Sequence, residues 1–252
     1  ATSLISIEYK IQGPSFTVSS ACSSANHAMG LAYETIKSRK SSIMITGGSE
    51  SFLSFGGIKP WESLRVLSQN KCRPFSKGRD GLVHGEGAGI FVFESLESAK
   101  NRKADIIAEI IGFSMSSDAS DLIKPNNIGP EKALRGVLKD GMTNKTDVSY
   151  INAHGTSTPA GDMVELAAMK TTFGENIPSI SSTKSLSGHS LGAAGVQEAI
   201  YSLLMLQNNF IAGSANIHQL DDAAKGLPII EKTIEGLELN RVMSNSFGFG
   251  GT

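Results

Sequence analysis

The chain has few cysteines and almost no excess charge. Its 252 residues contain two cysteines, Cys22 and Cys72, and so small a number predicts free thiols in a reducing compartment rather than a disulfide. The 23 basic and 24 acidic residues give a net charge of −1 and form no Lys/Arg-rich run. This balance excludes the basic footprint typical of nucleic-acid-binding proteins.

Long apolar runs are also missing. No segment approaches the roughly 18 to 20 apolar residues that a membrane-spanning helix needs. The first residues, Ala1 to Leu4, lack the basic start of a signal peptide. We therefore expect a soluble, cytoplasmic protein without a membrane span, long enough for one large or two smaller cores.

Motifs for metals and nucleotides are absent as well. The chain contains no His-x-His, His-Glu-x-x-His or Cys-x-x-Cys spacing, so the sequence predicts no zinc site. Gly85, Gly87 and Gly89 precede an apolar strand, whereas a dinucleotide-binding loop follows a strand and opens a helix. We expect no cofactor, and we interpret this loop as a place where the backbone approaches other groups closely.

Cys22 is the one candidate nucleophile. Residues 15–19 alternate as in a short strand, and residues 25–36 carry apolar residues at helical spacing. Cys22 would thus lie at a helix N-terminus, where the helix dipole can lower a thiol pKa from about 8.5 toward neutrality. Taken alone, an inert core cysteine remains the alternative, because free cysteines are commonly buried.

The remaining segments predict an α/β fold, because strands alternate with helices. The expected strands span residues 42–46, 90–94, 106–112, 148–152 and 241–245. The expected helices span residues 95–100, 131–139, about 158–170 and about 191–206, with short helices near Trp61. Thr158 and Pro159 suit the N-cap and first position of a helix. A second half begins near residue 105, which divides the chain into units 1–104 and 105–252.

Two histidines lie at element junctions like that of Cys22. His154 follows a strand and His189 precedes a helix, and ligands of open α/β sheets bind where strands end. If these strands are parallel neighbours, the three residues meet. A thiolate that attacks a carbonyl, with imidazole N–H groups that stabilise the developing charge, suits acyl transfer. Each histidine taken alone is more often structural.

Ser190 offers a competing nucleophile. Gly188-His189-Ser190-Leu191-Gly192 matches the Gly-x-Ser-x-Gly elbow of α/β-hydrolases. The elbow should directly follow an apolar strand, and an acid and then a histidine should follow the serine. Neither condition holds, since the only later histidine is His218 and the only acid before it is Glu198. A Ser190 hydrolase is therefore a remote alternative.

Taken together, five motifs resemble those of the β-ketoacyl-[acyl carrier protein] synthases of the thiolase superfamily. They are Ser20-Ala21-Cys22, Arg79-Asp80-Gly81 with Gly85 to Gly89, Asn152 to Asp162, Lys184 to Gly192, and Asn245 to Thr252. The two-histidine pattern is similar to the elongating class I and II enzymes, and closest to class I. The resemblance implies a partial thiolase-like layered αβαβα sandwich that lacks its N-terminal part and last strand.

The resemblance implies decarboxylative Claisen condensation in fatty acid elongation. Cys22 would take an acyl chain, and its N–H and that of Phe249 would form the oxyanion hole. His154 and His189 would hold a malonyl thioester. The remaining roles implied are electrostatic tuning by Lys184 and Glu165, contact with the pantetheine arm by Thr156 and Thr158, and gating of the acyl pocket by Phe249.

The implied partners are acyl carrier protein, acyl and malonyl thioesters, and a second copy of the full-length chain. A polyketide ketosynthase and a non-catalytic acyl-binding or carrier-binding member remain alternatives. An intact set of Cys22, His154 and His189 argues against the non-catalytic one.

Overall fold

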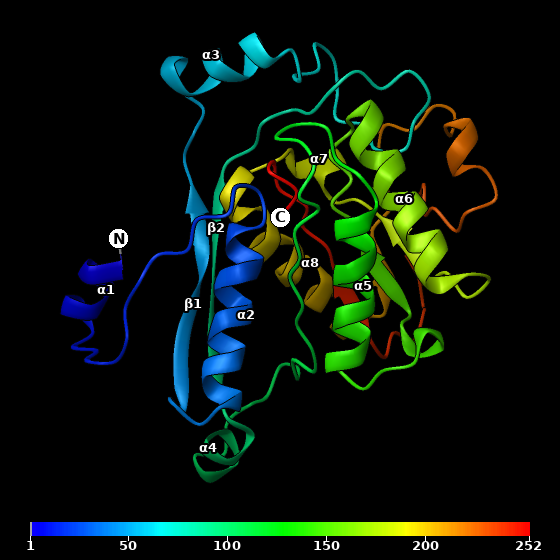
Figure 1. The fold of residues 1–252 in the computed structure, drawn as a ribbon. Helices are drawn as coiled ribbons and strands as arrows, with labels where there is room; N and C mark the ends of the chain where they lie inside the picture. Colours follow the sequence, from blue (N-terminus) through cyan, green and yellow to red (C-terminus); the bar gives the residue numbers. More distant parts are fainter. Residues whose placement is uncertain (1) are drawn as a thin grey trace.

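The computed structural model describes residues 2–252. The first layer of the fold is an antiparallel pair of strands. β1 (Ile43–Glu50) pairs with β2 (Gly87–Glu94) so that Ile45 lies opposite Val92. The helices α2 (Ser24–Lys37) and α8 (Ala194–Asn208) pack on one face of this pair (Figure 1). They form the second layer.

The third layer is a parallel sheet with the strand order β4-β3-β7. Its strands are β3 (Tyr150–Asn152), β4 (Ser179–Ser181) and β7 (Val242–Ser244). Successive residues of β3 face opposite sides, as the pleat requires. Tyr150 packs with residues of α8, and Ile151 packs into the larger core beneath α5 (Ile128–Asp140) and α6 (Pro159–Phe173).

The helices α5 and α6 form the fourth layer. Leu134 of α5 and Leu166, Met169 and Phe173 of α6 are buried against the parallel sheet. The layers thus alternate as in the predicted αβαβα sandwich. Within residues 2–252, no helix covers the outer face of the β1–β2 pair, where Ile90 and Val92 are exposed.

Shorter elements connect these layers. They are α1 (Thr2–Glu8), α3 (Phe55–Leu64), α4 (Leu96–Asn101), η1 (Lys145–Asp147), α7 (Lys184–Ser187), η2 (Leu191–Ala193), β5 (Phe210–Ile211), η3 (Asp222–Ala224) and β6 (Ile234–Glu235). In the described part of the chain, every helix is too short or too polar to cross a membrane.

Two predicted strands are wrong. Residues 15–19 and 106–112 contain no strand. Their alternation of apolar residues is typical of strands, but a strand also needs a hydrogen-bonded neighbour, and none of the described residues supplies one. By contrast, β1 extends beyond the predicted end at residue 46, through Gly47 and Gly48 to Glu50.

Candidate active site

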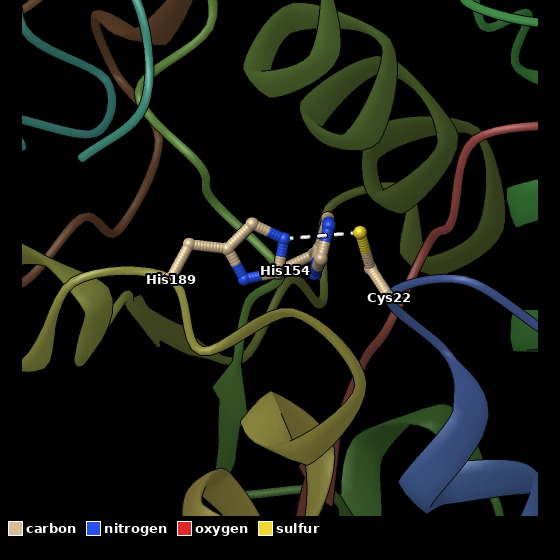
Figure 2. Close-up of side chains that lie close together, drawn as sticks. All are labelled: Cys22, His154 and His189. Atoms are coloured by element: carbon tan, nitrogen blue, oxygen red, sulfur yellow. Dashed lines mark hydrogen bonds between the residues drawn. The ribbon is translucent and has the colours of Figure 1, made fainter. Parts of the chain in front are cut away.

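Three side chains from distant segments converge at one point (Figure 2). Cys22 lies in the turn before α2, His154 follows β3, and His189 follows α7. His189 Nε2 is 3.0 Å from Cys22 Sγ, and the two imidazole rings lie edge to face with centroids 5.2 Å apart. All three residues are buried. The structure thus brings together the three residues for which the sequence predicted a common site.

The Cys22 thiol is protonated at neutral pH, contrary to the sequence-based expectation. Burial raises its pKa to about 11 and outweighs the opposing effects of the Lys184 charge and of hydrogen bonds from the backbone of Phe249 and Cys22. The backbone dipoles therefore act in the predicted direction, but desolvation is the larger effect. These two backbone groups are the ones for which the resemblance implied an oxyanion hole.

Both imidazoles are neutral. Burial, and after it the positive charge of Lys184, hold the pKa of His154 and of His189 well below its usual range. Lys184 Nζ lies 3.3 Å from His154 Nδ1. Because an ammonium group can only donate, Nδ1 accepts and the ring proton of His154 resides on Nε2. His154 therefore presents an N–H donor from Nε2.

Lys184 is itself held by a buried partner that sequence reasoning missed. Its ammonium group forms an ion pair with Glu198 of α8, and both side chains are almost completely inaccessible. A buried charge needs such a partner, because desolvation is otherwise too costly. The signal in the sequence was a single acid in the otherwise uncharged segment 191–206.

Glu165 fixes the backbone beside His154. Its two carboxylate oxygens accept hydrogen bonds from the backbone N–H groups of His154 and Gly155, each at 2.8 Å, and Asn245 Nδ2 donates to one of them at 3.2 Å. Burial raises the pKa of this carboxyl group, and the backbone hydrogen bonds oppose the rise. Glu165 thus orients the loop that carries His154.

A cavity of about 340 Å³ leads to these residues. Thr156 and Thr158, the predicted contacts of the pantetheine arm, line this cavity, and their hydroxyl oxygens lie 3.0 Å apart. Phe249 also lines the cavity and stacks on Trp61 with ring centroids 5.6 Å apart. A cavity of this volume, lined by Cys22, can accept a ligand whose reactive end reaches the thiol.

The loop of Thr156 and Thr158 is anchored by a buried arginine. The Arg79 guanidinium donates to the backbone oxygens of Thr158 and Pro159, at 3.3 and 2.8 Å, and forms ion pairs with Asp162 and Asp221. Asp162 in turn accepts from the backbone N–H of Ser157 at 3.0 Å. Arg79 and Asp162 belong to motifs that the sequence singled out without a role for either.

The glycine-rich loop supports His189. His189 N donates to Val83 O at 2.7 Å, and Gly85 N donates to His189 O at 3.0 Å. A Cβ atom on Gly85 would overlap the carbonyl oxygen of Ser187. The interpretation of this loop as a close approach of backbones is confirmed, and the group approached is the segment that carries His189.

Within residues 2–252, no base is hydrogen-bonded to the Ser190 hydroxyl. This hydroxyl donates to Gln197 Oε1, whereas the neighbouring His189 directs Nε2 at Cys22. A serine nucleophile needs a base within hydrogen-bond reach, so the geometry disfavours a Ser190 hydrolase.

Comparisons with known proteins agree on one family. The family described as "Beta-ketoacyl synthase, N-terminal domain" matches residues 1–99, and "Beta-ketoacyl synthase, C-terminal domain" matches residues 107–218. The 3-oxoacyl-[acyl-carrier-protein] synthase 1 of Haemophilus influenzae is 45% identical over 251 residues, which are 97% of this chain and 61% of that relative.

Solved structures give the same result. A β-ketoacyl synthase from Burkholderia phymatum superposes with a TM-score of 0.94 at 39% identity, over 98% of this chain and 62% of that one. A type II PKS ketosynthase in complex with its acyl-carrier protein superposes with a TM-score of 0.95 at 30% identity, over 99% and 64%.

The layered fold is therefore that of the thiolase-like ketosynthases, as the sequence predicted. The chain belongs to the β-ketoacyl synthase family. It spans about three fifths of the length of the relatives it matches.

Proposed function

We propose that this protein catalyses the decarboxylative Claisen condensation of an acyl-Cys22 intermediate with malonyl-[acyl carrier protein], in fatty acid elongation. The observation that carries the proposal is the buried meeting of Cys22 with two neutral imidazoles, one of them held by Lys184 as an Nε2–H donor. A lone buried cysteine would need no such neighbours.

In the first step, Cys22 Sγ attacks the carbonyl of an acyl thioester. The bond to the pantetheine sulfur breaks, and the thiol proton leaves with the released pantetheine thiol. His189 Nε2, 3.0 Å from Sγ, is placed to relay that proton. The N–H groups of Cys22 and Phe249 stabilise the oxyanion.

In the second step, the carbonyl oxygen of the malonyl thioester accepts a hydrogen bond from His154 Nε2–H. It accepts a second one from His189 Nε2–H, in the His189 tautomer that carries its ring proton on Nε2. Loss of CO₂ leaves an enolate, whose carbon attacks the acyl-Cys22 carbonyl. The Cys22 thiolate departs and regains a proton from solvent. Thr156 and Thr158 contact the pantetheine arm, and Phe249 gates the acyl pocket.

The roles of Cys22 and His154 can be separated by experiment. We expect intact-protein mass spectrometry after incubation with an acyl-carrier thioester to find one adduct, which peptide mapping places on Cys22. His154→Ala should still form the adduct but release no CO₂ from malonyl-[acyl carrier protein], and Cys22→Ala should form no adduct. Normal condensation by His154→Ala would contradict the assignment.

A polyketide ketosynthase is the second candidate, favoured by the similarity to the type II PKS ketosynthase. The two differ in product, because a polyketide enzyme repeats the condensation without reduction of the β-keto group. Incubation with excess malonyl-[acyl carrier protein] and no reductase would yield a single β-ketoacyl product for the fatty acid enzyme and a longer poly-β-keto chain for the polyketide enzyme.

We further propose that residues 1–104 and 105–252 are the two thiolase-like units of the chain. The family matches, which fall on either side of this boundary, support the division. The proposal extends to a cytoplasmic homodimer that needs no resident cofactor.

A further inference from the structure

The loop that carries Phe249 is attached to the N-terminal end of α2 on both sides of Phe249. Three residues before Phe249, Ser246 Oγ accepts a hydrogen bond from Asn26 Nδ2 at 2.9 Å. Three residues after it, Thr252 Oγ1 lies 3.1 Å from Ser23 Oγ. The loop is thus fixed at two points, with Phe249 midway between them.

The attachment after Phe249 involves the backbone as well as side chains. Ser23 Oγ donates its one proton to Ser20 O at 2.7 Å, so it accepts the hydrogen bond from the Thr252 hydroxyl. Gly248 N donates to Thr252 O at 2.6 Å, which closes a turn around Phe249. A Cβ atom on Gly248 would lie 3.0 Å from Ser20 O, so this turn lies directly against the segment of the nucleophile.

The attachment before Phe249 is enclosed by a third element. A Cβ atom built on Gly195 of α8 would lie 2.5 Å from Asn26 Oδ1 and 3.1 Å from Ser246 Oγ. The amide and the hydroxyl therefore occupy the space that a side chain at Gly195 would fill. Packed against α8 in this way, the Asn26 amide has little room to turn away from Ser246.

We propose that Asn26 is a positioning residue for the oxyanion hole. It lies on the helix that follows Cys22, and the backbone N–H of Phe249 donates to the Cys22 sulfur. By holding Ser246, Asn26 keeps this N–H directed at the point where the oxygen of an attacked carbonyl becomes negative. The inference rests on the acyl-transfer step of the proposed function, and on neither the malonyl substrate nor the carrier protein.

Two reagents separate this role from a general structural one. With p-nitrophenyl acetate, Cys22 Sγ attacks the ester carbonyl, the bond to p-nitrophenolate breaks, and the thiol proton leaves to solvent. This reaction passes through an oxyanion. Iodoacetamide alkylates the same sulfur by direct displacement of iodide and forms no oxyanion. Both rates scale with the thiolate fraction, so the ratio of acylation rate to alkylation rate reports the oxyanion hole.

Asn26→Leu keeps the shape of the side chain and removes the hydrogen bond. Loss of a whole oxyanion-hole donor slows a reaction about 100- to 1000-fold, so we expect its misplacement to lower the ratio about tenfold or more. Peptide-mapped mass spectrometry measures both adducts on Cys22. Ser246→Ala should lower the ratio likewise, and the double variant should be no slower than either single one, because both changes break one hydrogen bond.

Asn208→Leu is the matched control. Its amide donates to Leu204 O at the exposed end of α8, so this variant should keep the parental ratio. Circular dichroism checks each fold, and Ser246→Ala, the smaller change, carries the test should Asn26→Leu not fold.

Three results would overturn the proposal: an unchanged ratio, additive losses in the double variant, or no acylation of the parent by the ester. A parent that the ester acylates on Cys22 but that does not condense malonyl-[acyl carrier protein] would contradict the proposed function alone. The ratios of the variants would then still decide the role of Asn26.

Discussion

At the scale of single residues, the reactivity of Cys22 is set by the balance of desolvation against nearby positive charge and dipoles. Burial dominates, and it raises the pKa to about 11. In the ligand-free site, Cys22 is therefore a thiol of low reactivity rather than a thiolate. This restraint suits a buried nucleophile that should react only after a substrate has entered the cavity.

The titration of Cys22 gives a direct prediction. Because its pKa is about 11, the thiolate fraction rises about tenfold for each pH unit between pH 7 and 10. The rate of Cys22 alkylation by iodoacetamide should rise in proportion, without a plateau near neutrality. Peptide-mapped mass spectrometry resolves Cys22 from Cys72, whose pKa burial raises to about 12 and which should react more slowly. A plateau near pH 7 would show that the backbone dipoles outweigh burial.

Sequence reasoning at this scale identified the three candidate site residues that the structure brings together, but not the balance of effects on their pKa values. Cys22, His154 and His189 stand out by residue type and by position at element ends. The partner of Lys184 did not, because Glu198 lies 14 residues further along the chain and only the packing of α8 brings it near. Burial, which decides the Cys22 pKa, is likewise a property of the fold.

At the scale of elements, the segment before β2, which contains Gly85, supports the segment that carries His189 through backbone contacts. Gly85 lies against the Ser187 carbonyl and donates to His189 O. Gly85→Ala should push the two segments apart, since the added Cβ meets backbone that cannot rotate away. Overpacking of this kind costs about 1–3 kcal/mol, so we expect a lower urea midpoint together with slower decarboxylation.

The control for this substitution is Gly13→Ala. Nothing lies within 4 Å of a Cβ atom built on Gly13, so this variant should unfold and react as the parent does. Urea unfolding followed by circular dichroism, with CO₂ release as the activity assay, compares the two. Equal midpoints for Gly85→Ala and Gly13→Ala would mean that the segment of Gly85 shifts at little cost in stability and does not position His189.

Two ion pairs made by basic residues of one loop, Lys77 and Arg79, differ sharply in burial. The side chains of Arg79 and Asp162 are 3% and 0% exposed, whereas those of Lys77 and Asp222 are 53% and 65% exposed. Arg79→Gln removes one partner of a buried pair, which typically costs about 3–5 kcal/mol. It also frees the Thr158 and Pro159 carbonyls, so the KM for a carrier thioester should rise more than kcat falls.

Lys77→Gln is the matched control. Exposed ion pairs contribute little to stability because water screens them, so this variant should keep the parental unfolding midpoint and KM. Thermal unfolding and steady-state kinetics of both variants test the contrast. If Lys77→Gln destabilised the protein as much as Arg79→Gln, burial would not be the property that separates the two pairs.

Elements were predictable where the sequence carries a complete local signal. The helix α6 begins at Pro159 with Thr158 as its N-cap, as expected, and α2 and α8 follow their apolar spacing. Residues 15–19 and 106–112 show the alternation of a strand, which specifies the face that would be buried. Alternation does not specify a neighbouring strand to pair with. Gly47 and Gly48 suggest a turn, yet pairing with Ile90 and Gly89 keeps them in β1.

At the scale of the whole molecule, the site exists because layers bring distant segments together. Cys22 arrives from the helical layer of α2, and His154 from the parallel sheet. A single sequence predicts that each lies at an element end, but not that the ends meet. The resemblance supplied that expectation, and the meeting of the two histidines with Cys22 agrees with it (Figure 2).

The same layering leaves an apolar face uncovered, and this gives the last prediction. Ile90 and Val92 on β2 are 55% and 62% exposed, and Ile43 and Ile45 on β1 are exposed beside them. Contiguous apolar surface of this kind drives association and binds hydrophobic dyes. The 252-residue chain should therefore enhance the fluorescence of a hydrophobic dye such as ANS and associate with rising concentration in light scattering. Ile90→Thr with Val92→Thr should reduce both signals without lowering the unfolding midpoint, because neither side chain contributes to a core and threonine keeps the β-branched shape that strands favour. Met142→Thr, at an exposed position outside this sheet, should leave both signals unchanged. Equal reductions by the two changes would mean that exposed apolar residues act singly and that the uncovered sheet face has no special part in association.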